Sequence, residues 1–210
     1  MRNNKGFTLM ELIAAIFIGG MVTAALVLVW KTASLQTSQG QRHTIIRNQI
    51  SNFQRQLYRD FYETDIITWP EAGHTSDTLL LVGLKKAKQI NATQFECFYN
   101  AKPKGPTIVY AYCLDGNQVI RRFEELVTPA GGTQVKNISD YSSSYLSKCN
   151  SQGREVLTNF SHPNSHAATL ENDGYRFTFQ GTVQRTFQNR ANTTPIYIEI
   201  NETLLKQGGN

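Results

Sequence analysis

The chain has 210 residues, of which 40% are hydrophobic, and a formal net charge of +5 at pH 7. This length allows one domain of ordinary size beside an N-terminal helix. The charge excess is small and its residues are scattered, which argues against a nucleic-acid-binding protein. Only Lys85-Lys86-Lys88 and Arg121-Arg122 are grouped, and we expect both groups to lie on a solvated face.

The first thirty residues predict a membrane segment with a basic flank. Residues 7–30 contain one charged side chain, Glu11, and no proline. At about 1.5 Å per residue, a helix of this length matches a hydrocarbon core of about 30 Å. Because Arg2 and Lys5 precede it, the positive-inside rule places the N-terminus in the cytoplasm and the rest of the chain outside.

Glu11 needs a partner if it enters a membrane, because a carboxylate in hydrocarbon is costly. A cut after Gly6 would free the α-amine of Phe7, one helical turn before Glu11. An amine and a carboxylate would offset each other's desolvation, within one subunit or between neighbours.

Residues 5–12 (Lys-Gly-Phe-Thr-Leu-Met-Glu-Leu) resemble the cleavage and methylation signature of type IV pilins and type II secretion pseudopilins. This resemblance implies that a prepilin peptidase cuts between Gly6 and Phe7 and methylates the amine of Phe7. It also implies that Glu11 aligns each subunit against the next during assembly. Met10 stands where the family usually has a branched aliphatic residue, which is a mild departure.

Two other kinds of segment share this hydrophobicity. A secretory signal peptide would be cut beyond its apolar core, for instance near Ala24-Ala25, but Glu11 at the start of the core argues against it. An uncleaved signal anchor explains the apolar run and the basic flank. It does not explain Gly6-Phe7 with Glu11 at this offset.

The helix is expected to continue over residues 31–65, because this stretch has no proline and one glycine. Its apolar positions step by three or four residues, which is the pattern of one helix face. These positions are Ile46, Ile50, Phe53, Leu57 and Phe61. We therefore expect an amphipathic second half that packs its stripe against one globular domain.

From Thr78 onward the sequence predicts short strands separated by turns. Strand patterns occupy residues 78–82, 94–99, 107–113, 118–123, 175–179 and 195–200. Asp115-Gly116-Asn117 is a tight-turn signal that predicts a hairpin. Residues 128–165 are rich in Gly, Ser, Thr and Asn, so we expect a long loop with one short element near residues 141–146.

The three cysteines, Cys97, Cys113 and Cys149, all follow the membrane segment and would lie in an oxidising compartment. One disulfide and one remaining thiol are expected, and three pairings are open. We favour Cys97 with Cys113, because a loop centred near Gly105 would bring them opposite each other across a hairpin.

No catalytic or metal-binding pattern stands out in the sequence. His162 and His166 have helical spacing, but Pro163 between them disfavours a helix, so a solvated loop is the better interpretation. No acidic cluster matches the calcium loop of some pseudopilins, and there is no glycine-rich phosphate loop or Gly-x-Ser-x-Gly elbow. We expect neither an enzyme nor a cofactor.

The pattern predicts an α+β, pilin-like fold with a long N-terminal helix packed on antiparallel β-sheet. Residues 1–6 are expected to be a leader, 7–30 a transmembrane and filament-core helix, 31–65 its amphipathic continuation, and 66–210 an extracytoplasmic, periplasmic β-rich domain. The order of these elements is similar to that of J-type minor pseudopilins and related minor pilins. Many major pilins have a proline near the position of Leu28, and this chain has none there.

The resemblance implies a structural subunit of a type II secretion pseudopilus or type IV pilus that helps initiate assembly at the filament tip. Such a subunit crosses the bacterial inner membrane once before it is assembled. Its implied partners are prepilin peptidase and other minor and major pilins or pseudopilins. The alternative is a membrane-anchored extracytoplasmic binding or enzyme domain with an uncleaved anchor.

Overall fold

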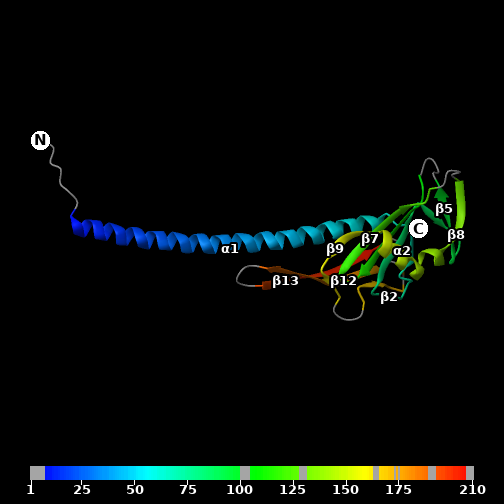
Figure 1. Cartoon of the computed structure of the whole chain (residues 1–210). Helices are drawn as coiled ribbons and strands as arrows, with labels where there is room; N and C mark the ends of the chain where they lie inside the picture. The colour runs from blue at the N-terminus through cyan, green and yellow to red at the C-terminus, as the bar shows by residue number, and fades with distance from the viewer. Residues whose placement is uncertain are drawn as a thin grey trace. The chain divides into compact units, whose positions relative to one another are not determined.

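The computed structural model describes residues 8–99, 105–127, 132–162, 166–172, 174, 176–188 and 193–206. One long helix, α1 (Leu9–Tyr62), is followed by a β-rich region (Figure 1). The contacts within the chain divide it into two units, Met1–Ile45 and Ile46–Asn210. This confirms the α+β class, with one long helix and antiparallel sheets.

The described strands form three antiparallel sheets. Their bounds are β1 (Ile66–Trp69), β2 (Thr75–Ser76), β3 (Leu79–Lys85), β4 (Ala87–Gln89), β5 (Gln94–Tyr99), β6 (Ile108–Asp115), β7 (Gln118–Glu125), β8 (Gly132–Asn137), β9 (Arg154–Thr158), β10 (Phe160–Ser161), β11 (Ala168–Leu170), β12 (Arg176–Gln188) and β13 (Thr193–Leu205). The first sheet has the order β1-β3-β6-β7-β9, and the third has the order β4-β5-β8. The second has the order β10-β12-β11-β2, with β13 paired to β12.

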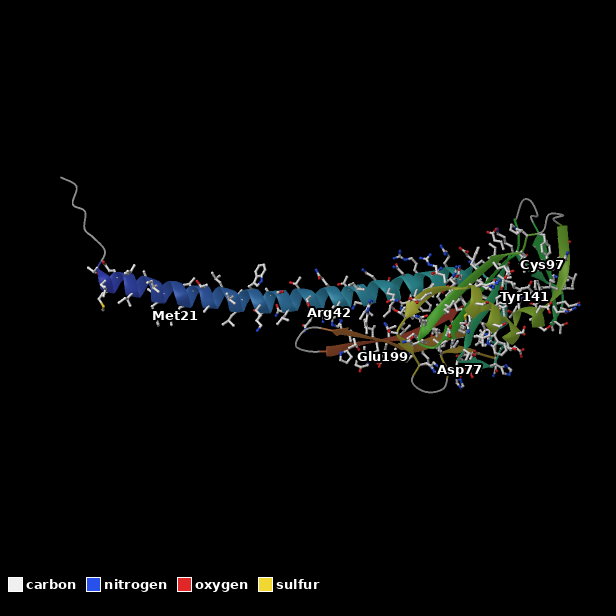
Figure 2. All side chains as sticks on the ribbon, in the orientation of Figure 1. Met21, Arg42, Asp77, Cys97, Tyr141 and Glu199 are labelled. Atoms are coloured by element: carbon white, nitrogen blue, oxygen red, sulfur yellow. A yellow bond between two sulfur atoms is a disulfide. The ribbon has the colours of Figure 1, made fainter. Side chains whose placement is uncertain are left out.

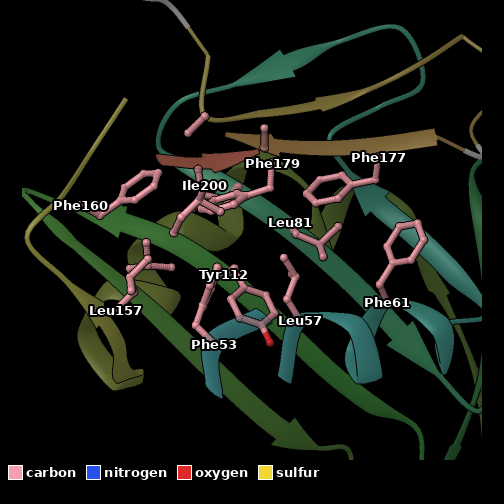
Figure 3. Close-up of a cluster of buried hydrophobic side chains, with 14 of the residues drawn as sticks. Phe53, Leu57, Phe61, Leu81, Tyr112, Leu157, Phe160, Phe177, Phe179 and Ile200 are labelled. Carbon is pink, nitrogen blue, oxygen red and sulfur yellow. The ribbon is translucent and has the colours of Figure 1, made fainter. Parts of the chain in front are cut away.

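The apolar stripe of α1 is confirmed as the centre of the main core. All five residues of the stripe, Ile46, Ile50, Phe53, Leu57 and Phe61, are at most 6% exposed. They pack with side chains from both larger sheets, such as Leu81 and Tyr112 from the first and Phe179 and Ile200 from the second (Figure 3). The ring of Phe53 lies 6.0 Å from that of Tyr112 and 5.2 Å from that of Phe179. The helix therefore joins the two sheets around one core.

Strand β3 is buried on both faces, which explains its nearly unbroken apolar sequence. All seven of its residues are buried. Leu81 belongs to the core beside α1, whereas Val82 and Leu84 belong to a second cluster that also holds Phe95 of the third sheet. A strand covered on both sides needs no polar alternation.

A buried carboxylate ties the last turns of α1 to the first sheet. Asp60 is fully buried. It accepts hydrogen bonds from Lys85 Nζ at 2.9 Å, Arg121 Nε at 2.6 Å and the Tyr112 hydroxyl at 2.7 Å. Burial alone would raise the pKa of Asp60, but the bonds from Arg121, Lys85 and Tyr112 outweigh it and hold this pKa below its ordinary value.

Of the basic residues expected on a solvated face, Lys85 and Arg122 are instead buried and Arg121 is partly buried, so that expectation is wrong for these three. Lys85 and Arg121 bind Asp60, and Lys85 also pairs with Glu63 at 2.8 Å. Arg122 is 9% exposed and pairs with Glu124 at 2.6 Å. Each cation has a carboxylate partner, as buried charges require.

The expectation of a long loop over residues 128–165 is also wrong for the part that the structure describes. Residues 132–162 contain β8, two short 3₁₀ helices (Ile138–Tyr141 and Ser143–Tyr145), α2 (Leu146–Gln152), β9 and β10. Polar contacts anchor this segment to β7: the Lys148 carbonyl accepts a hydrogen bond from Arg122 at 2.9 Å, and the Tyr145 hydroxyl donates one to Glu124 at 2.6 Å. Because these contacts are polar, the sequence of this segment shows no periodic spacing of apolar residues.

The disulfide joins Cys113 and Cys149, with 6.3 Å between their Cα atoms, and Cys97 is a buried thiol. The predicted pair Cys97–Cys113 is therefore wrong. Strand β5 does not form a hairpin with β6, because it lies in the third sheet, where Cys97 stands opposite Ala87 and Gln134. Cys149 lies on α2, in the stretch that was expected to be loop.

The cysteine pairing can be tested on the oxidised full-length protein. Peptide mapping should yield one linked pair, containing Cys113 and Cys149, with Cys97 alkylated only after denaturation. Cys149→Ser opens a loop with a sequence separation of 36 and should lower the free energy of unfolding by about 3–4 kcal/mol. Cys97→Ala is the matched control and should keep the bridge. Linked peptides that contain Cys97 would contradict this pairing.

The role of Asp60 predicts a pH-dependent effect of Asp60→Asn. The variant leaves Arg121 without an ionised partner and Lys85 with Glu63 alone, and should lose roughly 3–5 kcal/mol of unfolding free energy at pH 7. Because the folded pKa of Asp60 is lowered, the native carboxylate stabilises the fold above its unfolded pKa, and this stabilisation is lost as the pH falls through the folded pKa. Urea denaturation should therefore separate parent and variant more at pH 7 than at pH 3. Asp115→Asn, in an exposed turn, is the control, and an equal gap at both pH values would refute the role.

Candidate assembly segment at the N-terminus

The first turn of α1 is closed by a reciprocal pair of side chains, Thr8 and Glu11. The Thr8 N–H and its hydroxyl each donate to Glu11 Oε2 at 2.9 Å, and the Glu11 N–H donates to Thr8 Oγ1 at 3.3 Å. This arrangement is a capping box, which satisfies N–H groups that have no carbonyl partner within the helix. A carboxylate at this end is also favoured by the helix dipole.

Glu11 therefore has one partner within the chain before any subunit meets it. Both Thr8 donors reach Oε2, and among the described residues no donor reaches Oε1. Thr8 was not among the predicted site residues, although Thr-x-x-Glu before an apolar run is the sequence signature of a capping box. The second oxygen leaves room for a cation from elsewhere.

The following turns of α1 bury nothing within the chain. The helix contains a window of mean hydropathy 2.7, long and apolar enough to cross a membrane. Its large apolar side chains over residues 9–30 are between 54% and 79% exposed, and Figure 2 shows side chains projecting on either side of the ribbon around Met21. Apolar surface of this extent needs lipid or other helices to cover it.

Polar residues in this apolar stretch are satisfied by the helix itself. The Thr23 hydroxyl donates to the Gly19 carbonyl at 2.8 Å, and the Thr32 hydroxyl donates to the Leu28 carbonyl at 2.9 Å. Groups satisfied in this way can enter hydrocarbon without leaving a donor unpaired. Glu11 is the one charged side chain between Thr8 and Trp30.

The opposite end of α1 is also bonded to the second sheet. The Tyr58 hydroxyl donates to Glu202 of β13 at 2.6 Å, and Gln54 donates to the other oxygen of the same carboxylate. The bond to Glu202, with partial burial, raises the pKa of Tyr58 to about 12. Tyr58 therefore stays protonated and donates at any physiological pH.

The other predicted site residues are placed as follows. Gly6 and Phe7 lie outside the described residues, so the predicted cut and methylated amine have no described geometry. Glu11 lies in the first turn of α1. Among the described residues, which include His162 and His166, no group of three or more His, Cys, Asp or Glu side chains could hold a metal ion.

Residues 1–27 match the family model of the prokaryotic N-terminal methylation motif. This chain carries a prepilin-type N-terminus. The match spans the predicted leader, the predicted cleavage site and the first part of α1. Neither the curated proteins nor the solved structures contain a significant match to the chain.

The prepilin-type motif supports a pilin- or pseudopilin-like protein and implies contact with a prepilin peptidase and with other pilins in general. Together, the motif and the exposed apolar helix fit a membrane-anchored, single-pass protein. The motif does not distinguish J-type pseudopilins from other subgroups.

The capping box can be tested by Thr8→Val in the full-length protein in phospholipid nanodiscs. Loss of the cap should cost the first turn about 1 kcal/mol. The amides of Glu11 and Leu12, which bond to Thr8, should then exchange with deuterium about fivefold faster. Thr23→Val removes a hydroxyl of the same kind in mid-helix and should leave exchange at residues 9–12 unchanged. Equal exchange in Thr8→Val and the parent would exclude the cap.

Proposed function

We propose that this protein is a minor pilin or pseudopilin. It is a structural subunit without enzymatic activity, which helps initiate assembly at the tip of a type II secretion pseudopilus or a type IV pilus. The observation that carries this proposal is a prepilin-type motif whose glutamate lies in the first turn of a helix with an exposed apolar surface. Such a helix is built to be covered by a membrane first and by other subunits later.

The first step is insertion and processing. Arg2 and Lys5 hold the N-terminus in the cytoplasm, and the β-rich unit lies outside. The disulfide between Cys113 and Cys149 supports this topology, since disulfides persist in oxidising compartments. A prepilin peptidase then cuts between Gly6 and Phe7 and methylates the new amine.

The second step is registration in the filament. Thr8 holds one oxygen of Glu11, and the other oxygen meets the amine of Phe7 from the same or a neighbouring subunit. When the amine belongs to a neighbouring subunit, only one axial offset between the two helices pairs these charges. Other offsets leave a carboxylate in apolar surroundings, at a cost of several kcal/mol.

The third step couples the apolar helix to the β-rich unit. Helix α1 is one element from Leu9 to Tyr62, and its last turns are held by the main core, by Asp60 and by Glu202. When assembly draws the apolar half out of the membrane, these contacts keep the folded unit on the helix.

The absence of a proline in the apolar half of α1 supports a minor rather than a major subunit. The J-type subgroup is the finer assignment that we favour, from the order of helix, strands and turns. A minor pilin of a type IV pilus or a DNA-uptake apparatus is the nearest alternative. An uncleaved, membrane-anchored binding or enzyme domain is the alternative from another class.

Processing is tested by intact mass and N-terminal peptide mass spectrometry on protein from its native membranes. We expect a mature chain that starts at N-methylated Phe7. A chain that still starts at Met1, in cells with an active prepilin peptidase, would overturn the proposal and favour the uncleaved anchor.

Registration is tested by Glu11→Ala in the same cells. We expect cleavage after Gly6 to stay largely intact, because the cut site is unchanged, and incorporation into filaments to be lost. Glu71→Ala removes an exposed carboxylate of the β-rich unit and should be incorporated normally. Normal incorporation of Glu11→Ala, measured in sheared filament fractions, would exclude the registration role.

A further inference from the structure

An open cavity of about 410 Å³ lies where β10 meets the outer part of β12. Its size falls within the range of about 300–1,000 Å³ that is usual for small-molecule sites. Its lining is mostly polar and carries one charged side chain. It comprises three amide residues (Asn117, Asn159 and Gln184), two hydroxyl residues (Ser161 and Thr186), Arg185 and Phe160, whose side chain is buried in the main core.

Backbone hydrogen bonds hold the amide-bearing segments in place. The Phe160 N–H donates to the Asn117 carbonyl, and the Gln184 N–H donates to the Asn159 carbonyl, both at 2.9 Å. These bonds join the β6–β7 turn, the β9–β10 turn and β12 around the cavity. Within the described residues, the side-chain amides of Asn117 and Asn159 have no hydrogen-bond partner, so both are available to a ligand.

An exposed aromatic ring stands beside Gln184, one of the amide residues that line the cavity. Tyr197 of β13 is 60% exposed and lies opposite Gln184 in the β12–β13 register. Its hydroxyl accepts a hydrogen bond from Gln184 Nε2 at 3.4 Å, which holds the two side chains together. Its ring offers a flat apolar face next to groups that both donate and accept.

The outward face of the second sheet continues from the cavity with the same chemistry. The stretch of β12 between Gln184 and Thr178 is about 20 Å long. The outward side chains there are Thr182 and Gln180 of β12, Ser161 of β10, and Glu199 and Asn201 of β13. Glu199 is the one charged side chain among these five. A row of four threonines follows across four strands: Thr75, Thr169, Thr178 and Thr203. Cross-strand threonines also stabilise a sheet, so the row alone does not indicate a ligand. It supports a binding face because it continues directly from the cavity.

We infer that the cavity and the adjoining face bind a neutral glycan. Sugar hydroxyls both donate and accept hydrogen bonds, as amides and hydroxyls do, and the C–H face of a sugar ring stacks on an aromatic ring such as that of Tyr197. Arg185 also lines the cavity, but it already makes an interaction within the chain. Recognition therefore rests on the amides rather than on charge. This inference does not depend on prepilin processing.

The test uses the full-length protein in phospholipid nanodiscs, because sugar-based detergents would compete. Chitotetraose and maltotetraose, two neutral probes, are titrated and followed by saturation-transfer NMR against empty nanodiscs. We expect saturable binding of at least one probe, tighter for the tetrasaccharide than for its monosaccharide. Gln184→Ala and Tyr197→Ala should each weaken it by about fivefold or more, the loss expected for one good contact.

Gln134→Ala, which removes an exposed amide from β8 of the third sheet, is the matched control and should bind like the parent. The disulfide map of each variant checks that it folds. Three outcomes would overturn the inference: no binding of either probe above the blank, unchanged binding by both site variants, or binding of dextran sulfate but of neither neutral probe.

Discussion

The desolvation of two carboxylates governs how this chain is built, because each sits near one end of α1. Asp60 is buried among Lys85, Arg121 and Tyr112, so its charge is balanced within the chain. Glu11 is hydrogen-bonded by Thr8, but the described residues near it carry no cation. The same physics therefore gives opposite results: a closed network that stabilises the folded unit, and an incomplete one that another charge must complete.

The β-rich unit is organised so that this closed network is largely buried. Strand β3 separates two clusters, one centred on the stripe of α1 and one that holds the disulfide and Phe95. Lys85 emerges from the end of β3 and reaches Asp60 from that position. Because β3 contributes side chains to both clusters, a change of packing in either cluster should alter the contacts between α1 and the first sheet.

Local patterns predicted the parts of the fold that local chemistry determines. The stripe on α1, six of the strands (β3, β5, β6, β7, β12 and β13) and the Asp115-Gly116-Asn117 hairpin follow from periodicity and turn residues, and the prepilin-type motif follows from spacing. What the patterns missed depends on distant partners. The segment with α2 is held by Arg122 and Glu124 from β7, so its sequence shows no apolar periodicity. The wrong partner for Cys113 came from assuming that β5 and β6 form a hairpin, whereas β5 pairs with β4 and β8. The role of Thr8 could have been predicted from the sequence, since its spacing from Glu11 is the signature of a capping box.

The two units divide the physical tasks of the protein. The groups that the proposed assembly chemistry needs lie in the first thirty residues, where a single carboxylate and an apolar surface suffice to select a register. That chemistry therefore places no demand on the outer face of β12 and β13. A face under no such demand tends to become a solvated, charged surface, yet between Thr178 and Gln184 this one carries a single charged side chain, Glu199, together with amides, threonines and Tyr197 beside a cavity. Its composition is better explained by recognition of an uncharged polar ligand than by solubility alone.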